Sequence, residues 1–481
     1  MPSAADAPHG ADPDAPHGAN PGDAHGANPG DAHGADPGDA PPRGRNRRTG
    51  RTRRVGRTRP VGRTRPVGRV RTLLSRSVAD TRPLSIPAFR RAFIGQSVSV
   101  IGLMASSVAV PVQLYALTHS SAVVGVSGLA ALLPTVVFGL YGGAVADAVD
   151  RRKLYLGSCS LTWIVSLALM LQSLLHVRSP ALILVLVAVQ SGGFAVSSSV
   201  RGAIVPRLVP ADQISAANGL LYSVGNLGQV LGPLLAGALL ALPGGFALVY
   251  GADAALFTVA LYAAFRLPHL PSPSGASAGF PGLRSVADGL LFITRNPVLL
   301  MSFLVDVAAM MLAGPEALFP QAAAERFHGG VGPLYSAIAA GALVAGLFSG
   351  WIGRVRRQGV ALTAAVIVWA TAIAAAGLTH TLWAVIALLA LGGAADLVSA
   401  VYRQTILQSY VPDHLRGRLQ GVYTVVVAGG PRLGDLRAGT MAAVVPLTLA
   451  WSASAFACAA LVLAAALAVR PFWRYRAETV G

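Results

Sequence analysis

Three charged residues interrupt an apolar run late in the chain, in the segment GGPRLGDLRAG (429–439). Arg432 and Asp435 are spaced i,i+3, so on a helix their side chains lie on one face and can form an ion pair. Arg437 is left over, and a guanidinium without compensation in hydrocarbon is very costly. We therefore expect Arg437 either to meet a carboxylate of another segment across a central cavity or to bind an anionic substrate.

Carboxylates also occur inside two other apolar runs. Asp306 stands in SFLVDVAAM and Asp396 in GGAADLVSA, and these are the carboxylates that Arg437 could meet. Intramembrane carboxylates are expensive and usually face a cavity, a partner or a proton pathway, and burial favours a form that exchanges its proton near neutral pH. We expect Asp306, Asp396 and Asp435 to line the substrate or proton pathway. Glu316, nearer the outer edge, either joins them or is interfacial.

The elements that position these residues must be membrane helices, because the chain is too apolar for a soluble protein. Of its 481 residues 53% are hydrophobic and only 12% are charged, whereas a soluble protein carries about 25% charged residues. Uncharged runs such as 181–200 and 361–378 approach the ~20 residues that a helix needs to cross a bilayer. They lack the alternation of strands. The sequence predicts an all-α polytopic membrane protein, with Cys159 and Cys458 as core-filling thiols rather than a disulfide framework.

Twelve hydrophobic segments follow residue 88, in the order six, linker, six. They are 92–117, 121–146, 154–175, 180–200, 214–241, 245–266, 297–319, 332–353, 360–378, 381–402, 419–445 and 448–469. The predicted units are an N-terminal six-helix bundle (86–267), a cytoplasmic linker with a short amphipathic helix (268–295), a C-terminal six-helix bundle (296–470) and a cytoplasmic tail (471–481).

Residues 1–85 form a separate low-complexity segment. A degenerate octad rich in Pro, Gly, Asp and Ala (17–40) has no apolar face to bury and is expected to be disordered. The arginine tract that follows (43–72) has no interleaved aromatic residues and no fold to present its charges. We expect it to lie on anionic lipid at the cytoplasmic face rather than to bind nucleic acid. A misassigned translation start would also produce such a tail.

Cations gather on one side of the predicted membrane. With the N-terminus inside, the ends of the even-numbered segments carry Arg151, Arg152, Lys153, Arg201, Arg207, Arg266, Arg354, Arg356, Arg357, Arg403, Arg416, Arg418, Arg470, Arg474 and Arg476. Only Arg178 and Arg326 are clear cations of the opposite loops. The positive-inside bias therefore places both termini in the cytoplasm. Lys153 is the single lysine, and so strong an arginine bias suggests a GC-rich genome and hence a bacterial plasma membrane.

The two halves of the chain repeat one pattern. At a shift of 202 residues, RGAIVPRLVPADQISAANG (201–219) aligns with RQTILQSYVPDHLRGRLQG (403–421), which places Arg201 on Arg403. Two homologous six-helix halves related by an axis along the membrane normal are typical of secondary transporters. The charged triplet at 432–437 has uncharged counterparts in the first half, so the fold does not require it and we interpret it as functional.

A cluster of charges follows the second predicted helix, in GLYGGAVADAVDRRKLYLG (139–157). Its glycines allow a neighbouring helix to approach closely. The cluster either pairs across helices in one state of an alternating transporter or is only a positive-inside loop. The candidate residues of this cytoplasmic gate are Gly143, Asp147, Asp150, Arg151, Arg152, Arg201 and Arg403.

The segment GGAVADAVDRRK resembles the loop signature between the second and third helices of the major facilitator superfamily. Further stretches resemble the branch of that family that contains the bacterial enterobactin exporter. They are FRRAFIGQSVSVIG, AIVPRLVPADQISAANGL, RNPVLLMSFLVDVAAM and TILQSYVPDHLRGRLQGVYTVVVAGGPRLGDLRAG, and the likeness covers about 88–470. The resemblance implies twelve helices in two pseudo-symmetric bundles. It also implies that Asp147 pairs near the eleventh helix with support from Arg201.

Two positions depart from the family pattern. Ala148 stands where a basic residue usually follows the loop acid, and Leu103 stands where members of the branch often carry an acid in the first helix. If that acid couples transport to protons in relatives, its role must move to the second half of this chain.

Together these features predict a secondary transporter that exports a small amphipathic, anionic compound such as a siderophore, by alternating access and proton-coupled antiport. A multidrug or antibiotic exporter is the alternative within the class, and a transport-dead membrane sensor is the alternative outside it. The sequence lacks a catalytic triad, a P-loop and a zinc-ligand spacing. We therefore expect no enzymatic activity, no metal and no cofactor, with a proton gradient as the energy source. The expected partners are the substrate, the bilayer and anionic lipid, with no nucleic acid and a monomeric chain.

Overall fold

The structure is a computed structural model that describes residues 80–148, 150–268, 290–410, 416–469 and 472. The predictions for the octad, for the arginine tract before residue 80 and for most of the linker and the C-terminal tail lie outside these residues. In the described part the chain is helical throughout, without a strand. Residues 290–295, at the end of the predicted amphipathic stretch, are helical as well.

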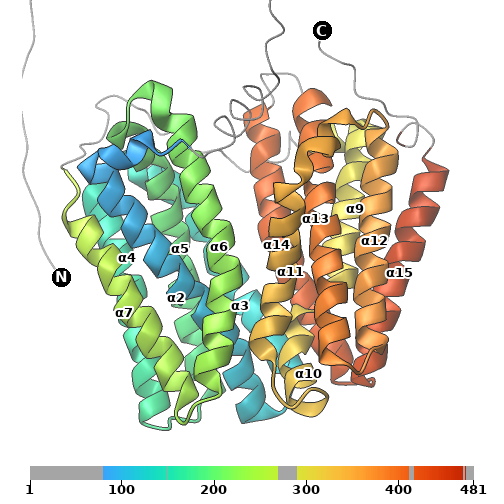
Figure 1. Cartoon of the computed structure of the whole chain (residues 1–481), viewed down its shortest axis with the longest axis horizontal. Coiled ribbons are helices and arrows are strands. Elements are labelled where there is room, and N and C mark those ends of the chain that lie inside the picture. Colours follow the sequence, from blue (N-terminus) through green and yellow to red (C-terminus); the bar gives the residue numbers. More distant parts are fainter. Residues whose placement is uncertain (1–79, 149, 269–289, 411–415, 470–471, 473–481) are drawn as a thin grey trace, which may run out of the picture. The chain divides into compact units, whose positions relative to one another are not determined.

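Each of the twelve predicted segments corresponds to a helix or a broken helix (Figure 1). The first half contains α2 (Pro87–Thr118), α3 (Ser121–Ala148), α4 (Arg151–Leu174), α5 (Pro180–Leu208), α6 (Ile214–Leu240) and α7 (Gly245–Phe265). The second half contains α9 (Pro297–Ala313), α10 (Phe319–Glu325), α11 (Val331–Leu347), α12 (Gln358–Leu378), α13 (Leu382–Tyr410), α14 (Arg416–Ala442) and α15 (Leu447–Ala468). Ten stretches of the described chain are long and apolar enough to cross a membrane, and α11 is a shorter apolar helix.

The seventh segment is not the continuous helix that its hydropathy predicts. It consists of α9, the short 3-10 helix η3 (Glu316–Leu318) and α10, with a break at Gly314-Pro315. Proline lacks a backbone N–H and disfavours helical geometry at the residue before it, so the helix ends there. The Tyr335 hydroxyl donates a hydrogen bond to the Glu316 carbonyl at 2.9 Å, and the same carbonyl accepts from the backbone N–H of Phe319.

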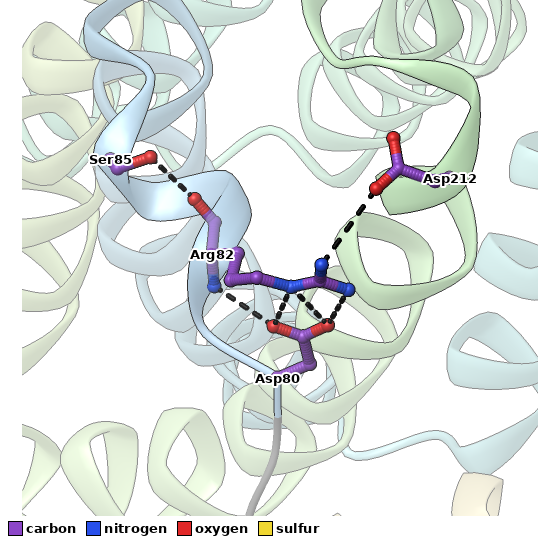
Figure 2. Close-up of polar contacts among 4 residues, drawn as sticks. All are labelled: Asp80, Arg82, Ser85 and Asp212. Carbon is purple, nitrogen blue, oxygen red and sulfur yellow. Dashed lines mark hydrogen bonds and ion pairs between the residues drawn. The ribbon is translucent and has the colours of Figure 1, made fainter.

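Arg82 forms two ionic contacts just before the first helix. Arg82 donates from Nη2 to Asp80 Oδ2 at 2.7 Å, and its Nη1 lies 3.7 Å from Asp212 Oδ2, as Figure 2 shows. The hydrogen bonds from Arg82 lower the pKa of the Asp80 carboxyl below its ordinary value. The contact between Arg82 and Asp212 connects the 3-10 helix η1 (Arg82–Ser85) with η2 (Ala211–Gln213), which precedes α6.

The helices form two bundles whose most extensive contacts with each other are made by two helix pairs. Within the first half, α2 packs on α6 and α7, and α4 packs on α5 and α7; within the second half, α13 packs on α11 and α12, and α15 on α12 and α9. Between the halves, α3 packs along α14 and α6 packs along α11 (Figure 1). We call the end of the helices at which the linker leaves α7 the linker end, and the opposite end the distal end.

The contacts between the bundles are close because glycines meet backbone there, in the distal halves of the helices. A Cβ on Gly439 of α14 would lie 2.1 Å from the Ser121 carbonyl oxygen of α3, and a Cβ on Gly237 of α6 would lie 2.8 Å from the Cα of Gly332 in α11. The Ser121 hydroxyl also donates to Gln321 Oε1 at 2.8 Å. Tyr115 donates its hydroxyl hydrogen to the Glu325 carboxylate across the same end.

Close packing within the C-terminal bundle yields a first prediction. A Cβ on Gly341 of α11 would lie 1.8 Å from the Ala390 carbonyl oxygen of α13, a backbone atom that cannot rotate away. We expect Gly341→Ala to lower the free energy of unfolding by about 1–3 kcal/mol, as overpacking does. The measurement is thermal unfolding of the purified protein in detergent.

Gly202→Ala is the matched control, because a Cβ on Gly202 would meet nothing within 4 Å. It should leave the unfolding temperature unchanged or raise it slightly, since alanine favours a helix. Equal stability of the two variants would show that α11 and α13 are not in contact at this point.

Candidate functional site

A buried ion pair joins α9 to α13. Arg403 Nη1 lies 2.6 Å from Asp306 Oδ1, and the side chains of Arg403 and Asp306 are only 4% and 2% exposed. Sequence reasoning placed Arg403 at a cytoplasmic gate and offered Asp306 as a partner of Arg437. The structure gives the Asp306 carboxylate to Arg403 instead of Arg437, and the gate role of Arg403 stays a prediction. The sequence alone could not show this pairing, because the two residues lie on different helices and almost a hundred positions apart.

The first half contains a counterpart of this pair. Arg201 of α5, which aligns with Arg403, donates to Gln96 Oε1 of α2. Gln96 and Asp306 hold the same place in their helices, since each is nine residues after the proline that begins the helix. In each half, therefore, an arginine at the equivalent position contacts one polar side chain. The partner is a neutral amide in the first half and a carboxylate in the second.

Asp396 is a third charged residue near the pair of Asp306 and Arg403, and it lies on α13. It lies between the distal end and Arg403, its side chain is exposed, and Ser399 Oγ lies 3.5 Å from its Oδ1. It interacts electrostatically with Asp306. A charged group at this depth faces water rather than lipid, because hydrocarbon cannot solvate it. Asp396 therefore marks a water-accessible face of α13.

The pair expected within the charged triplet of α14 is present. Arg432 Nη1 lies 3.8 Å from Asp435 Oδ2, with side chains that are 49% and 14% exposed. Glu316, in η3, interacts electrostatically with Asp435, Asp396 and Arg432. Charged groups thus follow one another from the buried Arg403 to the accessible Arg432. This series, from α13 through α9 and η3 to α14, is the candidate site.

Arg437 contacts neither Asp306 nor Asp396 in the described structure, contrary to one of the two roles predicted for it. Its guanidinium donates to the Leu312 carbonyl oxygen at 3.2 Å and to the Ser454 hydroxyl, with Met441 Sδ at 3.7 Å. These neutral acceptors lie on α9, α15 and α14, so the hydrogen bonds of Arg437 connect these three helices. The accessible cation of the triplet is Arg432.

Apart from Arg403, the predicted gate residues that can be described have their contacts within the N-terminal bundle. The surroundings of Gly143 and the side chain of Asp147 are not described, although both positions belong to α3. Asp150 caps α4 and accepts from the backbone N–H of Arg152 at 2.9 Å. Arg152 Nη2 donates to the Phe265 carbonyl oxygen at 2.7 Å, and Arg151 is buried. These contacts connect α4 with the end of α7; the pairing of Asp147 near α14 stays a prediction.

Sequence reasoning missed one intramembrane acid, Asp253 of α7. Its side chain is fully buried, and its Oδ2 accepts from Ser106 Oγ at 2.9 Å and from Ser166 Oγ at 2.8 Å. The signal was visible as an aspartate within the apolar run 245–266. The first half therefore also contains a buried acid, and the expectation that proton coupling moves to the second half stays a prediction. The α2 backbone directly beside Leu103, at Gly102, lies against Asp253.

Comparisons with known proteins agree with this architecture. A family model described as transmembrane secretion effector matches residues 78–477. The enterobactin exporter of Citrobacter koseri is 30% identical over 392 residues, which cover 80% of this chain and 91% of that protein. A bacterial homologue of the iron transporter ferroportin is 15% identical in its solved structures. Its inward-facing state matches with a TM-score of 0.62 over 81% of this chain and 99% of that one, and its outward-facing state with 0.53 over 80% and 99%.

The buried pair generates a second prediction. Asp306→Ala leaves the Arg403 guanidinium buried without its carboxylate, which should lower the free energy of unfolding by about 3–5 kcal/mol. Combining Asp306→Ala with Arg403→Met should restore most of the loss, because no charge then stays buried. Thermal unfolding of the purified variants measures both effects.

Arg432→Ala serves as the comparison, because its side chain is 49% exposed and lies 3.8 Å from Asp435, so its loss should cost less than that of Asp306. If the double variant at 306 and 403 is as unstable as the sum of its single variants, the two side chains do not depend on each other and the pairing is refuted.

The environment of Arg437 generates a third prediction. Arg437→Ala removes hydrogen bonds to Leu312 and Ser454 and should cost about 1–3 kcal/mol. Because Arg437 and Asp306 do not touch, the loss from adding Asp306→Asn should be additive to within about 0.5 kcal/mol. A rescue of the Arg437 variant by the second change would show instead that the two charges neutralise each other.

Proposed function

Because this chain belongs to the major facilitator superfamily, in the family of transmembrane secretion effectors, we propose that it exports a siderophore-like compound from the bacterial cytoplasm. The family and the helices make it a multi-pass membrane export transporter. The single observation behind the substrate class is the 30% identity with an enterobactin exporter across 91% of that protein's length. Similarity over the whole length includes both bundles and therefore the cavity-facing helices.

Arg432 is the residue that we assign to an anionic group of the substrate. Its side chain is 49% exposed, and it lies about 15 Å from the distal end of α14 at 1.5 Å per residue. A guanidinium at that depth needs water or an anion beside it. Its contact with Asp435, at 3.8 Å, is loose enough for a stronger anion to displace. The sequence-based assignment to Arg437 is replaced by this one.

The arrangement of the bundles supports loading from the cytoplasm. The cation-rich linker end is the cytoplasmic side by the positive-inside bias, which also places both termini inside. The contacts of Gly439 with Ser121 and of Gly237 with Gly332 hold the bundles together at the opposite, distal end. The better match to the inward-facing ferroportin homologue is consistent with that arrangement. In this state a substrate enters from the cytoplasm, and opening of the glycine contacts would release it outside.

We further propose that proton antiport drives the cycle through Asp306 and Asp396. Protonation of Asp306 would remove the negative charge that holds Arg403, and the freed guanidinium would then need another partner. Asp396, accessible and electrostatically coupled to Asp306, is suited to pass the proton between water and the buried pair. No nucleotide or metal is required in this scheme.

The fourth prediction tests the substrate class. Proteoliposomes that contain the full chain should transport enterobactin, and Arg432→Ala should reduce its apparent affinity about ten- to a hundredfold, the effect of a lost charge-assisted bond. Arg90→Ala, which removes an exposed cation at the linker end of α2, is the charge-matched control and should leave transport unchanged.

The same assay separates the rival functions. Transport of ethidium and other drugs without transport of enterobactin would replace the siderophore proposal by multidrug export. Transport of neither class by a folded, inserted protein would favour a membrane sensor. Unchanged enterobactin affinity in Arg432→Ala would refute the anion-binding role of this arginine while leaving export intact.

A further inference from the structure

We propose that the N-terminal bundle contains a proton-binding site of its own, formed by Asp253 with Ser106 and Ser166, which exchanges protons with the distal side of the membrane. Its role in transport rests on the export function proposed above, whereas the binding of a proton does not. The site lies in α2, α4 and α7 and is separate from the charged series of the C-terminal bundle.

The geometry isolates the Asp253 carboxyl inside the bundle. Asp253 is fully buried and lies eight residues from the distal end of α7, or about 12 Å. Its Oδ2 accepts both serine hydroxyls, while its Oδ1 is buried and has no hydrogen-bond partner among the described residues. A Cβ on Gly102 would lie 2.8 Å from that Oδ1. Backbone of α2 thus fills the space beside the carboxyl, which leaves room for a proton rather than for a metal ion with its several oxygen ligands.

The ionisable groups on the packed helices are remote or neutral. They are Arg90, Arg91 and Tyr115 of α2; Arg151, Arg152, Lys153, Tyr155 and Cys159 of α4; Arg201 and Arg207 of α5; Tyr222 of α6; and Tyr250, Tyr262 and Arg266 of α7. The cations of these helices lie toward the linker end, about 15 Å or more from Asp253 along the helix axes. The loop between α4 and α5 adds His176 and Arg178, which line the distal cavity described below. Among the described residues Asp253 therefore has hydroxyl donors but no ion-pair partner, and a buried carboxylate in that situation is stabilised by taking up a proton.

The serine hydroxyls can satisfy either protonation state. Ser166 Oγ lies 2.8 Å from Asp253 Oδ2 and 3.1 Å from the Thr162 carbonyl oxygen, and it has a single hydrogen to donate. With Asp253 ionised, that hydrogen points to the carboxylate. With Asp253 protonated, the carboxyl donates to a serine oxygen and Ser166 donates to Thr162. A rotation of one hydroxyl therefore accompanies proton uptake, without any movement of a helix.

Polar side chains continue from this site to the distal surface. A cavity of about 410 Å³ at the distal end is lined by Gln113 of α2 and Gln172 of α4, among others. Gln113 Oε1 accepts from Gln172 Nε2 at 3.0 Å and from the Tyr250 hydroxyl at 2.8 Å. Tyr250 lies one turn before Asp253 on α7. Because the distal end is the outer side in the proposed orientation, these polar groups lie between Asp253 and the compartment from which an antiporter takes its protons.

The direct test is infrared difference spectroscopy of the full chain in lipid nanodiscs, recorded across a pH titration. We expect a carbonyl-stretch band of a protonated carboxyl group that titrates in the wild type and is lost in Asp253→Asn. Ser166→Ala should keep the band but shift its frequency, because the carboxyl loses a hydrogen-bond partner. Cys159→Ser, a change of similar size on the same helix, should leave the band in place. An identical band in wild type and Asp253→Asn would overturn the proposal.

A transport assay then separates this site from the proposed function. In proteoliposomes, Asp253→Asn should retain enterobactin exchange without a pH gradient but lose at least tenfold of its acceleration by a gradient. Full acceleration in Asp253→Asn would refute a coupling role for the site. If the wild type does not move enterobactin at all, the export proposal fails, while the titrating band still decides whether Asp253 binds a proton.

Discussion

Every charged group within the membrane helices must be compensated, because hydrocarbon offers neither water nor counterions. The chain meets this requirement in three ways. Asp306 and Arg403 neutralise each other at 2.6 Å in a buried pair, Arg437 donates to a carbonyl and a hydroxyl, and Asp253 accepts from two serines. Each solution draws on different helices, so the positions of α7, α9, α13 and α15 are tied to the charges that they compensate.

The differences between the two halves indicate where the chemistry lies. The repeat places an arginine of the fourth helix on a polar residue of the first helix in both bundles, but Gln96 is neutral where Asp306 is ionisable. Only the second pair can be opened by a proton. The charged triplet of α14 likewise has no charged counterpart in α6. Asp253, by contrast, gives the first half an acid whose compensation is entirely neutral, so the two bundles differ in the kind of group that can respond to a proton.

Glycines of α14 allow this helix to pack closely against helices of both bundles. Gly430 and Gly434 let α14 approach Met310 of α9, while Gly439 lets the same helix approach α3 of the other bundle. The charged residues between them therefore lie on a helix that belongs to one bundle and touches the other. A change in the charge state of α14 can act on the contact between the bundles, which is the contact that the proposed transport cycle would open. Small residues permit that movement because they interlock less than large side chains.

The sequence by itself determined the membrane helices, their number and the ion pair of Arg432 with Asp435. A run of about twenty apolar residues has no stable alternative to a membrane helix, and an i,i+3 pair is fixed by helix geometry alone. The break at Gly314-Pro315 was missed because hydropathy does not register backbone geometry. Only the tertiary structure decided that Asp306 pairs with Arg403, that Arg437 connects helices through neutral acceptors and that Asp253 accepts from two serines. Those partners lie on other helices, and which side chains meet depends on how each helix is rotated and tilted against its neighbours, information that no local spacing contains.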